Sequence, residues 1–546
     1  MADEATRTAN DASERETGPA AEKRSTVARS TAMISAATLL SRVTGFLRTW
    51  ACAFALGNTL LTSAYQIANS VPNMLYELVA GGVLSTAFLP IYLSQRKEHG
   101  EDGANAYAAN LLNLFVSGLF VIAALATIFA PQVIKTQTFV TGGEDAEMAT
   151  FFFRFFAIQI AFYGASAIVS GVLNANKRFL WPALGPVFNN LIVIVTFFGF
   201  VPLSHLNPSV AKIWLATGTS LGVAMQVIAQ LPSLRKSGFR FRHGIKLRGY
   251  ALGETARLAV PAIIFTAVNL VCVSVRNAFS LGVSEMGPST LSYAWLWYQL
   301  PYGVLAVALS TAMFTEMSSS AAKGDLSAFR DNVRSGLRGT FFLIIPMATL
   351  LCVMSSMLVT LYHAGRFTAD DIAMVAQVLR WWAVCLPFYA GYMYLYFAFS
   401  ARKDLMTVTK VNTLISLLQM SLYALLTMGI GSWGGLGLIG IPIADICFFS
   451  LMFIVLYLIL RRRIGSFTQG DLRGLLARVL IASAAGGMIA YGLNRLLGQT
   501  TSIAGAFVHI LVAGGCGLVV VYGICALLKV EEMSIFTRLI GRFRRG

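Results

Sequence analysis

Of the 546 residues in this chain, 56% are apolar and only 12% are charged, whereas soluble globular domains carry about 25% charged residues. This composition excludes an ordinary soluble enzyme or binding domain. The net charge of +17 would suit nucleic-acid binding in a soluble protein. Here the basic residues follow apolar runs, so we expect membrane lipids and no nucleic acid as partners.

Fourteen apolar runs are each long enough to cross a bilayer, which takes about 20 helical residues. Only helices and closed barrels satisfy their backbone in lipid, and the ~10-residue alternating segments of a barrel are absent. The predicted fold is therefore an all-α polytopic membrane protein. The expected spans are 33–56, 64–94, 107–131, 149–174, 183–203, 210–232, 255–282, 290–317, 336–362, 372–399, 409–430, 434–460, 474–494 and 502–528.

The two ends of the chain are polar or basic. Residues 1–30 contain no apolar run, which predicts a disordered cytoplasmic tail. Residues 529–546 mix apolar and basic side chains, which is typical of an amphipathic helix lying on the inner leaflet.

Basic residues follow the even-numbered spans, from Arg96 and Lys97 after the second to Arg461, Arg462 and Arg463 after the twelfth. The intervening loops carry few. This alternation is the positive-inside pattern and predicts that both termini lie in the cytoplasm.

The sequence repeats itself at a distance of six spans. The segment that begins at Arg154 matches the one that begins at Arg380, and Lys177 pairs with Lys403 at an offset of 226 residues. The tetrapeptide Leu-Ser-Thr-Ala at 84–87 recurs at an offset of 225. An even number of spans gives both copies the same orientation, so the repeat is parallel.

The repeat predicts the domain organisation. The ranges are an N-terminal half at 31–232, a basic linker at 233–253, a C-terminal half at 254–460 and two additional spans at 461–528. Transporters built in this way usually bind substrate between the halves and alternate access by rocking.

Four charged residues lie inside predicted spans near the expected contact of the halves: Arg42, Arg48, Glu77 and Arg276. A charge at mid-bilayer costs at least about 2.5–3.5 kcal/mol and normally faces a cavity or a partner. The donor fork of arginine suits phosphate. We therefore expect a cationic cavity for a phosphate or pyrophosphate group. The alternative is an ion pair between Arg42 and Glu77 that holds two helices together.

Asp445 is a single acid in the twelfth span. It is either a cation or proton site or a hydrogen-bonding partner of a neighbouring helix. No phosphate-binding loop, zinc signature or nucleophile elbow is present. We expect no enzyme activity, no metal, no cofactor and no ATP site. Energy would come from an ion gradient, the membrane potential or the substrate gradient.

Several segments resemble the MurJ (MviN) family of lipid II flippases, which belongs to the multidrug/oligosaccharidyl-lipid/polysaccharide exporter superfamily. The octapeptide SRVTGFLR at 41–48 resembles the first-helix motif, and Pro72-Asn73 resembles the second. Segments at 173–186, 301–305 and 365–368 are similar to later parts of the family pattern, in the same order.

The resemblance implies a function in cell-wall synthesis. Members of the family move the undecaprenyl-pyrophosphate-linked peptidoglycan precursor, lipid II, from the inner to the outer leaflet of the bacterial cytoplasmic membrane. The implied partners are lipid II and the cell-wall synthesis machinery. The candidate substrate-binding residues are Ser41, Arg42, Arg48, Asn73, Tyr76, Glu77 and Arg276.

The chain departs from the better-known members of the family at several positions. Those members have arginine at the position of Tyr76, a carboxylate at Gly81, and Asp-Arg at Trp295-Leu296. Tyr-Glu-Leu followed by Gly-Gly looks like an actinobacterial variant, and Arg276 would supply the second-half cation. Two alternatives remain open: a cation-coupled drug or polysaccharide exporter on the same scaffold, and a transport-inactive scaffold in cell-wall assembly.

Overall fold

The computed structural model describes residues 19–77, 88–241, 244, 252–466 and 471–534. Helices dominate this part of the chain, and its only β-type pairing is an isolated bridge between Ile430 and Trp433. The predicted all-α class is confirmed.

Contacts divide the chain into two compact units that do not follow the sequence halves. The first unit comprises Met1–Ala51, Leu84–Ala124 and Phe156–Ala256, and the second comprises Cys52–Val83, Leu125–Phe155 and Arg257–Gly546. Segments 52–83 and 125–155 therefore pack with the second unit, although they belong to the first sequence repeat. Their contacts with helices of the second repeat form part of the site described below.

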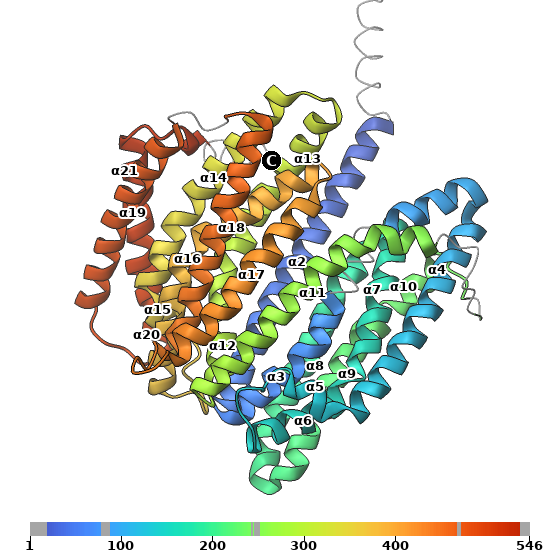
Figure 1. The fold of residues 1–546 in the computed structure, drawn as a ribbon, viewed down its shortest axis with the longest axis horizontal. Coiled ribbons are helices and arrows are strands. Elements are labelled where there is room, and N and C mark those ends of the chain that lie inside the picture. The colour runs from blue at the N-terminus through green and yellow to red at the C-terminus, as the bar shows by residue number, and fades with distance from the viewer. Residues whose placement is uncertain (1–18, 78–87, 242–243, 245–251, 467–470, 535–546) are drawn as a thin grey trace, which may run out of the picture. The chain divides into compact units, whose positions relative to one another are not determined.

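The first unit contains α7 to α10 and most of α2 and α4. Its elements are α2 (Pro19–Leu56), α4 (Leu89–Ile128), α7 (Gln159–Ala175), α8 (Leu180–Leu206), α9 (Pro208–Ile228) and α10 (Leu231–Lys236). Helices α8 and α9 lie side by side along their length (Figure 1). A buried cluster joins α4 to α7 and includes the ring of Phe88, whose centroid is 5.6 Å from that of Tyr92 and 5.9 Å from that of Tyr107.

The second unit is larger and is centred on α14, α16 and α18 (Figure 1). Its elements are α3 (Leu60–Glu77), α5 (Ala130–Lys135), α6 (Glu144–Phe156), α11 (Leu252–Val283), α12 (Gly287–Pro301), the π-turn η2 (Tyr302–Ala306), α13 (Val307–Ala322), α14 (Leu326–Val353), α15 (Ser355–Thr360), α16 (Ala369–Ala401), α17 (Leu405–Met428), η3 (Gly437–Ile439), α18 (Gly440–Ile464), α19 (Asp471–Leu496), α20 (Ile503–His509), the π-turn η4 (Ile510–Gly514), α21 (Gly515–Leu527) and η5 (Glu531–Met533). Helices α19 and α21, which carry the two predicted additional spans, pack against each other.

Within the described residues, ten helices are long and apolar enough to cross a membrane, and the bent pair α6 and α7 makes an eleventh candidate. The three other predicted spans fall on α2, α3 and α9. Helix α3 is not apolar enough to be counted among the membrane-crossing helices, because Gln66, Asn69 and Asn73 interrupt its apolar residues. The count of fourteen therefore stays a prediction.

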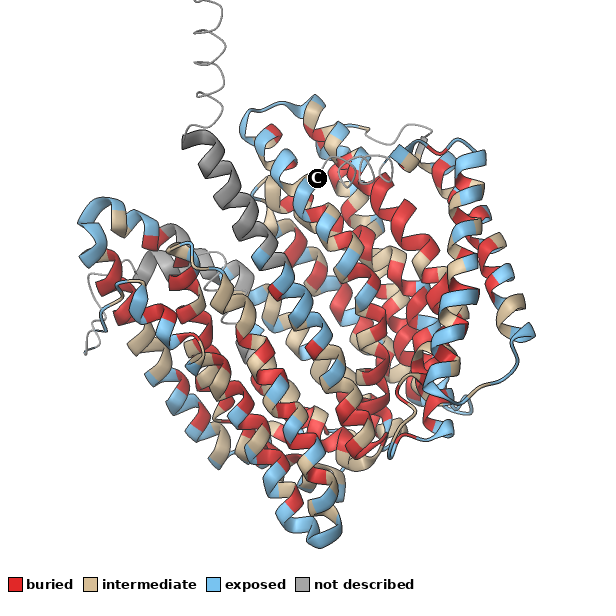
Figure 2. Ribbon diagram, turned by 180° about the vertical axis from the view of Figure 1, so that it is seen from behind, coloured by how far each residue is buried: buried red, intermediate tan, exposed pale blue. Residues whose placement is uncertain are grey.

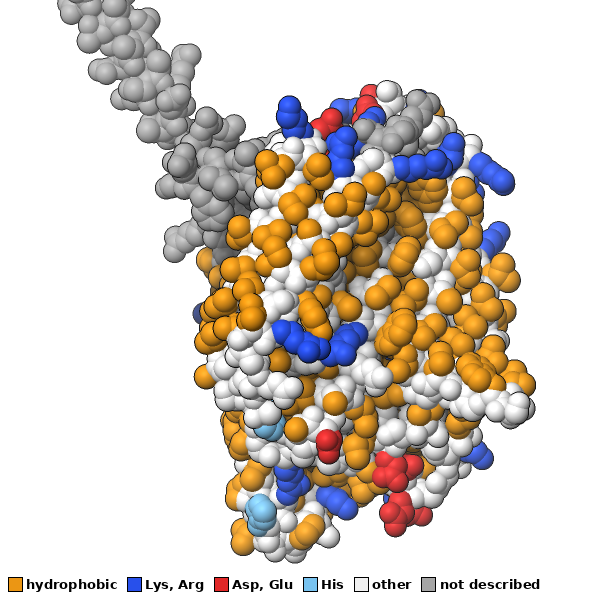
Figure 3. All heavy atoms as spheres, turned by 90° about the vertical axis from the view of Figure 1, so that its left-hand side faces the viewer, with side chains coloured by type: hydrophobic (Ala, Val, Ile, Leu, Met, Phe, Trp, Pro, Cys, Tyr) orange, Lys and Arg blue, Asp and Glu red, His pale blue; other side chains and the backbone are white. Residues whose placement is uncertain are grey.

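Exposed side chains of the helices are largely apolar, as a lipid environment requires. Leu206 and Leu496, for example, expose more than four fifths of their surface. Figure 2 shows exposed residues recurring along the helices. On the face in Figure 3, hydrophobic side chains cover much of the middle, and most charged side chains lie toward the two ends, apart from one basic group between them.

Two predicted boundaries differ from the structure. Helix α2 begins at Pro19 and includes residues 19–30, which the composition assigned to a disordered tail; alanine, glutamate, lysine and arginine in this stretch are good helix formers. Helix α4 joins the end of the second predicted span to the third, with a break at Gly100, whose φ is 69°. Residues 1–18 lie outside the described part of the chain.

The start of the predicted C-terminal tail is held by ion pairs. The buried guanidinium of Arg338 on α14 donates to the carboxylate of Glu532 and, at 3.0 Å, to that of Glu531. Both acids belong to η5, which follows α21. The rest of the tail, 535–546, lies outside the described residues.

The two sequence repeats form the same turn at equivalent positions. Lys177 after α7 and Lys403 after α16 both have a φ of 58°. In each turn the residue that follows the lysine donates its N–H to the carbonyl five residues earlier, at 2.8 Å for Arg178 and 3.0 Å for Asp404. This six-to-one bond is the Schellman pattern of a helix end. The match supports the offset of 226 residues between Lys177 and Lys403.

The left-handed lysines generate a test of the repeat. A side chain costs roughly 1 kcal/mol in this backbone region, and glycine avoids that cost. We expect Lys177→Gly and Lys403→Gly each to raise the melting temperature of the purified protein in detergent. Lys323→Gly is the matched control, because Lys323 also ends a helix but has a φ of −80°. An equal rise in the control would contradict the interpretation.

Candidate functional site

In the first unit, the motif at 41–48 places its small residues against α8. The amide of Asn190 donates to Thr44 Oγ1 at 3.1 Å, and Thr44 itself is buried. A side chain at Gly45 would also point toward the Asn190 amide. Thr44 and Gly45 therefore fix the contact between α2 and α8.

The two arginines of this motif take no part in that contact. The side chain of Arg42 is exposed and that of Arg48 is half-buried, as is Ser41. Neither arginine forms an ion pair with a described residue of its own unit. Their guanidinium groups thus remain available to an anionic ligand.

In the second unit, α3 carries the Pro-Asn motif inside the helix. Pro72 has no N–H to donate, and the Asn73 amide donates to the carbonyl of Asn69 at 2.7 Å. Glu77 is exposed at the last residue of α3. The side chain of Tyr76 lies outside the described part of the chain, so its predicted role stays a prediction.

Arg276 on α11 rests on an aromatic ring of α12. Its guanidinium carbon is 5.6 Å from the centroid of the Trp295 ring, which is a cation–π distance. The Nε of Arg276 is buried and has no hydrogen-bond partner among the described residues. Trp295 stands where better-known family members have an acid, and here its ring supports the arginine. One N–H of Arg276 remains for an acceptor on a ligand or water.

Asp445 on α18 is surrounded by hydrogen-bond donors. Trp382 Nε1 on α16 donates to Oδ2 at 2.8 Å, and Gln419 Nε2 on α17 donates to Oδ1 at 2.8 Å. The Tyr423 hydroxyl also donates to Oδ1. A bound cation would have to displace these donors, whereas a carboxylate that joins three helices needs them.

Aromatic contacts connect Arg276 to Asp445. The Trp295 ring lies edge-on to that of Trp382 with centroids 5.4 Å apart, and Trp382 donates to Asp445. The charge of Arg276 also acts electrostatically on the Asp445 carboxylate. Together these groups form a network of opposite charges within one unit.

Helix α17 presents further polar groups on the same side. Asn412, Ser416, Gln419 and Tyr423 follow a helical spacing of four, three and four residues, so they share one face. Asn412 and Ser416 are fully buried, and the Asn412 amide has no hydrogen-bond partner among the described residues. This face was not among the predicted site residues, although the helical spacing of its polar residues within the predicted span 409–430 could have indicated it.

A second polar cluster, here called the axis cluster, joins segments of the two repeats inside the second unit. It consists of Asn58, Ser63, Ser289, Thr290 and Tyr293. The Asn58 amide donates to Thr290 Oγ1 at 2.9 Å, and the Tyr293 hydroxyl donates to the carbonyl of Gly57 at 2.9 Å. Nearby, Asn277 donates to the Gln137 side chain at 2.9 Å.

Ser63 and Ser289 lie 226 positions apart, which matches the offset of Lys177 and Lys403 and differs by one residue from the offset of 225 at 84–87. Their hydroxyl oxygens are 3.2 Å apart and buried. Two symmetry-related residues can touch only where the axis that relates them passes. The contact therefore lies close to the pseudo-twofold axis expected of the repeat.

Comparison with known proteins assigns the chain to a family of transporters. The family model described as "Lipid II flippase MurJ" matches residues 52–512. A probable lipid II flippase MurJ of Rhizobium tropici is 25% identical over 86% of this chain and 88% of its own length. The corresponding protein of Thermotoga maritima is 29% identical over 74% of this chain and 81% of its own length.

Solved structures show the same fold. A lipid II flippase MurJ in an inward closed conformation superposes with a TM-score of 0.73 at 22% identity, covering 92% of this chain and 99% of its own. An inward-facing multidrug transporter of the MATE family gives a TM-score of 0.65 at 14% identity, covering 79% and 96%. These likenesses establish the fold alone.

The donors around Asp445 lead to a test of its role. Asparagine at this position would turn an amide toward at least one donor, and a buried unsatisfied donor costs about 1–3 kcal/mol. We expect Asp445→Asn to lower the melting temperature by the same amount in sodium and in choline buffers of equal ionic strength. Stabilisation of the wild type by sodium, lost in the variant, would instead make Asp445 a cation site.

Proposed function

The chain belongs to the MurJ family of lipid II flippases, and we propose that it moves lipid II from the inner to the outer leaflet of the bacterial cytoplasmic membrane by alternating access. The family match over residues 52–512 carries this proposal. The positive-inside pattern supports a topology with both termini in the cytoplasm. Lipid II then enters from the side of its synthesis.

We assign binding of the pyrophosphate head group to Arg42, Arg48 and Arg276. Arg42 and Arg48 precede the matched residues, so their assignment rests on their charge and on their unpaired state within the first unit. Arg276 has a buried Nε without an acceptor. A guanidinium offers several donors in a fixed fork, which is the geometry that phosphate oxygens accept.

Polar residues of α2 and α3 complete the assignment. Ser41 lies beside Arg42, and Asn73, Tyr76 and Glu77 lie on α3. Hydroxyl, amide and carboxylate groups suit the sugar hydroxyls and the peptide of the precursor. They would orient the head group, while the arginines supply the charge.

Asp445 is assigned as the fixed counter-charge of Arg276. Its three donors hold the carboxylate in place, and the Arg276 charge acts on it. A half-buried arginine in a membrane span is stabilised by such an opposite charge. The arrangement supports a structural role for Asp445. Its negative charge offsets the positive charge of Arg276 while no anionic ligand is bound.

The membrane potential is a sufficient driving force for the proposed step. The interior is negative, and each elementary charge that crosses 100 mV is worth about 2.3 kcal/mol. Outward movement of the anionic pyrophosphate therefore follows the electrical gradient. No ATP is required by this scheme.

The axis cluster is assigned to the gate that must open during alternation. Its hydrogen bonds join first-repeat segments to α12, and the Ser63–Ser289 contact lies close to the expected pseudo-twofold axis. In a parallel repeat, rocking of the halves separates residues at one end of this axis.

The rival function is a cation-coupled exporter on the same fold, which needs an acid that is free to bind a cation. The hydrogen-bond donors around Asp445 do not favour cation binding at this residue.

Replacement of the arginines tests the head-group assignment. We expect Arg42→Ala, Arg48→Ala and Arg276→Ala each to reduce lipid II flipping in proteoliposomes at least about tenfold, since one charge-assisted hydrogen bond contributes roughly 1.5–3 kcal/mol. Lysine at the same positions should restore part of the activity.

Arg461→Ala is the matched control, because Arg461 is an exposed basic residue at the end of a span. Each variant should also be tested for rescue of a flippase-depleted bacterium. Rescue by all three alanine variants would refute the head-group assignment. Failure of the wild type to flip lipid II or to rescue growth would instead support a scaffold without transport.

A disulfide across the axis tests the gate. Because the two serine oxygens are 3.2 Å apart, the double variant Ser63→Cys, Ser289→Cys should form a disulfide under mild oxidation. We expect oxidation to stop flipping and a reductant to restore it.

The single variants Ser63→Cys and Ser289→Cys are the controls and should keep their activity in both conditions. Mass spectrometry of the joined peptides confirms that the bond has formed. Full activity of the cross-linked protein would show that this end does not open during transport.

A further inference from the structure

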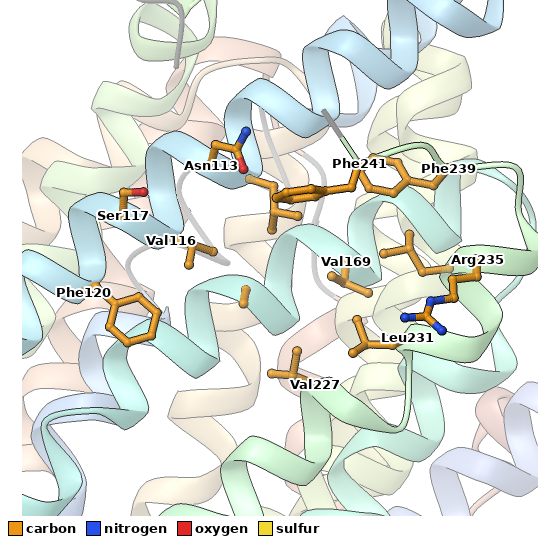
Figure 4. A pocket seen from close by; sticks show the side chains of 13 residues that line it. Asn113, Val116, Ser117, Phe120, Val169, Val227, Leu231, Arg235, Phe239 and Phe241 are labelled. Atoms are coloured by element: carbon orange, nitrogen blue, oxygen red, sulfur yellow. The ribbon is translucent and has the colours of Figure 1, made fainter. Parts of the chain in front are cut away.

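The first unit contains a large pocket that the proposed transport mechanism does not use. It has a volume of about 730 Å³, within the range of small-molecule sites. Its walls come from α4, α7, the end of α9, α10 and the segment that follows α10 (Figure 4). All of these residues belong to one compact unit.

The lining of the pocket is apolar except at defined points. Val116, Phe120, Val169 and Val227 contribute apolar side chains, and Arg235 contributes a charge on the α10 side. Figure 4 shows Arg235 and Phe120 on opposite sides of the pocket, with Phe239 and Phe241 of the segment after α10 along one edge. A ligand that fits must combine a long apolar part with an anionic group.

The rim of the pocket is open rather than sealed by protein. Phe120, Leu231 and Phe241 expose 45%, 38% and 51% of their surface, although all three are large apolar residues. Exposed apolar side chains of a membrane protein normally contact lipid. The pocket is therefore accessible to a molecule that already lies in the bilayer.

Positive charge is concentrated beside this rim. Arg235 and Lys236 end α10, and the Arg178 guanidinium donates to the carbonyl of Lys236. Basic groups near a membrane surface attract anionic lipids by about 1 kcal/mol each. This complementarity selects a lipid with a net negative head group over a zwitterionic one.

We propose that the pocket binds an anionic glycerophospholipid, with one acyl chain between α4 and α7 and the phosphate on Arg235. The site is separate from the arginines assigned to lipid II. A phospholipid is favoured over the undecaprenyl chain because the pocket is bounded by protein on several sides and has room for a short unbranched chain.

The proposed lipid also contacts the segment that joins the two sequence repeats. The amide of Asn105 donates to the carbonyl of Gly238 at 3.5 Å, and that of Asn113 donates to the carbonyl of Gly244 at 3.0 Å. Both asparagines lie on α4, so they hold this segment along the pocket. A lipid that fills the space beneath Phe239 and Phe241 would add apolar contacts to these two hydrogen bonds and stabilise the connection.

Photolabelling of the purified full-length protein tests the site. The probe is a phosphatidylglycerol with a diazirine at the end of one acyl chain, diluted into phosphatidylcholine nanodiscs. We expect mass spectrometry to find label on α4 and α7, and Arg235→Gln to reduce it at least about fivefold. Val227→Phe, which fills the pocket and keeps the arginine, should have a similar effect.

Arg461→Gln is the matched control, since it removes one basic residue at a span end elsewhere and should leave the label within about twofold of wild type. The same diazirine on phosphatidylcholine should label α4 and α7 much less. Trypsin cleavage within 233–253 provides a second measurement, because phosphatidylglycerol should slow it in the wild type and not in Arg235→Gln.

Three results would overturn the proposal. Equal labelling by the two phospholipids would make the pocket an ordinary lipid-facing groove. Unchanged labelling of both pocket variants would place the lipid elsewhere. Displacement of the label by equimolar lipid II would make the pocket part of the substrate path. None of these results depends on flipping activity, so they are distinguishable from failure of the proposed function.

Discussion

The cost of placing a charge inside a bilayer governs the arrangement of the polar residues in this protein. A buried ion survives only when hydrogen bonds, an opposite charge or a ligand replace the water that it has lost. Asp445 illustrates the first solution, because donors from α16 and α17 occupy both of its oxygens. Arg276 illustrates an incomplete solution, since Trp295 covers its face while Nε remains without an acceptor. Such incomplete solutions are where a ligand is expected to bind.

The repeated sequence explains a second level of organisation. Equivalent residues form equivalent turns. Lys177 and Lys403 both adopt a left-handed backbone conformation, because similar local sequences end their helices in the same way. Where the two copies meet, equivalence has a different consequence. The hydroxyls of Ser63 and Ser289 touch each other close to the expected axis, and small hydroxyls would suit the proposed gate, which has to close tightly and separate again. A large apolar pair at this point would resist opening.

The sequence predicted the helical class and most span positions, since length and hydropathy decide these in a membrane protein. It also placed Arg276 and Asp445 inside spans, but it did not connect them. Their connection runs through Trp295 and Trp382, whose side chains look like ordinary apolar residues in a membrane sequence. Aromatic residues that carry a hydrogen bond or a cation contact are recognisable only when the helices are packed. Residues 19–30 were predicted to be part of a disordered tail, whereas α2 begins at Pro19, because a polar composition predicts exposure and not the absence of a helix.

The departures from the better-known family members have a consistent electrostatic effect. Where those members have an acid and an arginine on the eighth helix, this chain has Trp295 and Leu296, and the arginine stands one helix earlier at Arg276. The acid stands on α18 as Asp445. The second unit thus keeps one positive and one negative charge in its polar network, while their positions differ. Because that network is balanced internally, the net positive charge available to a pyrophosphate comes mainly from Arg42 and Arg48 on α2. In the proposed function, the first helix would therefore supply most of the electrostatic attraction for the head group, and Arg276 would contribute its directed N–H more than its charge.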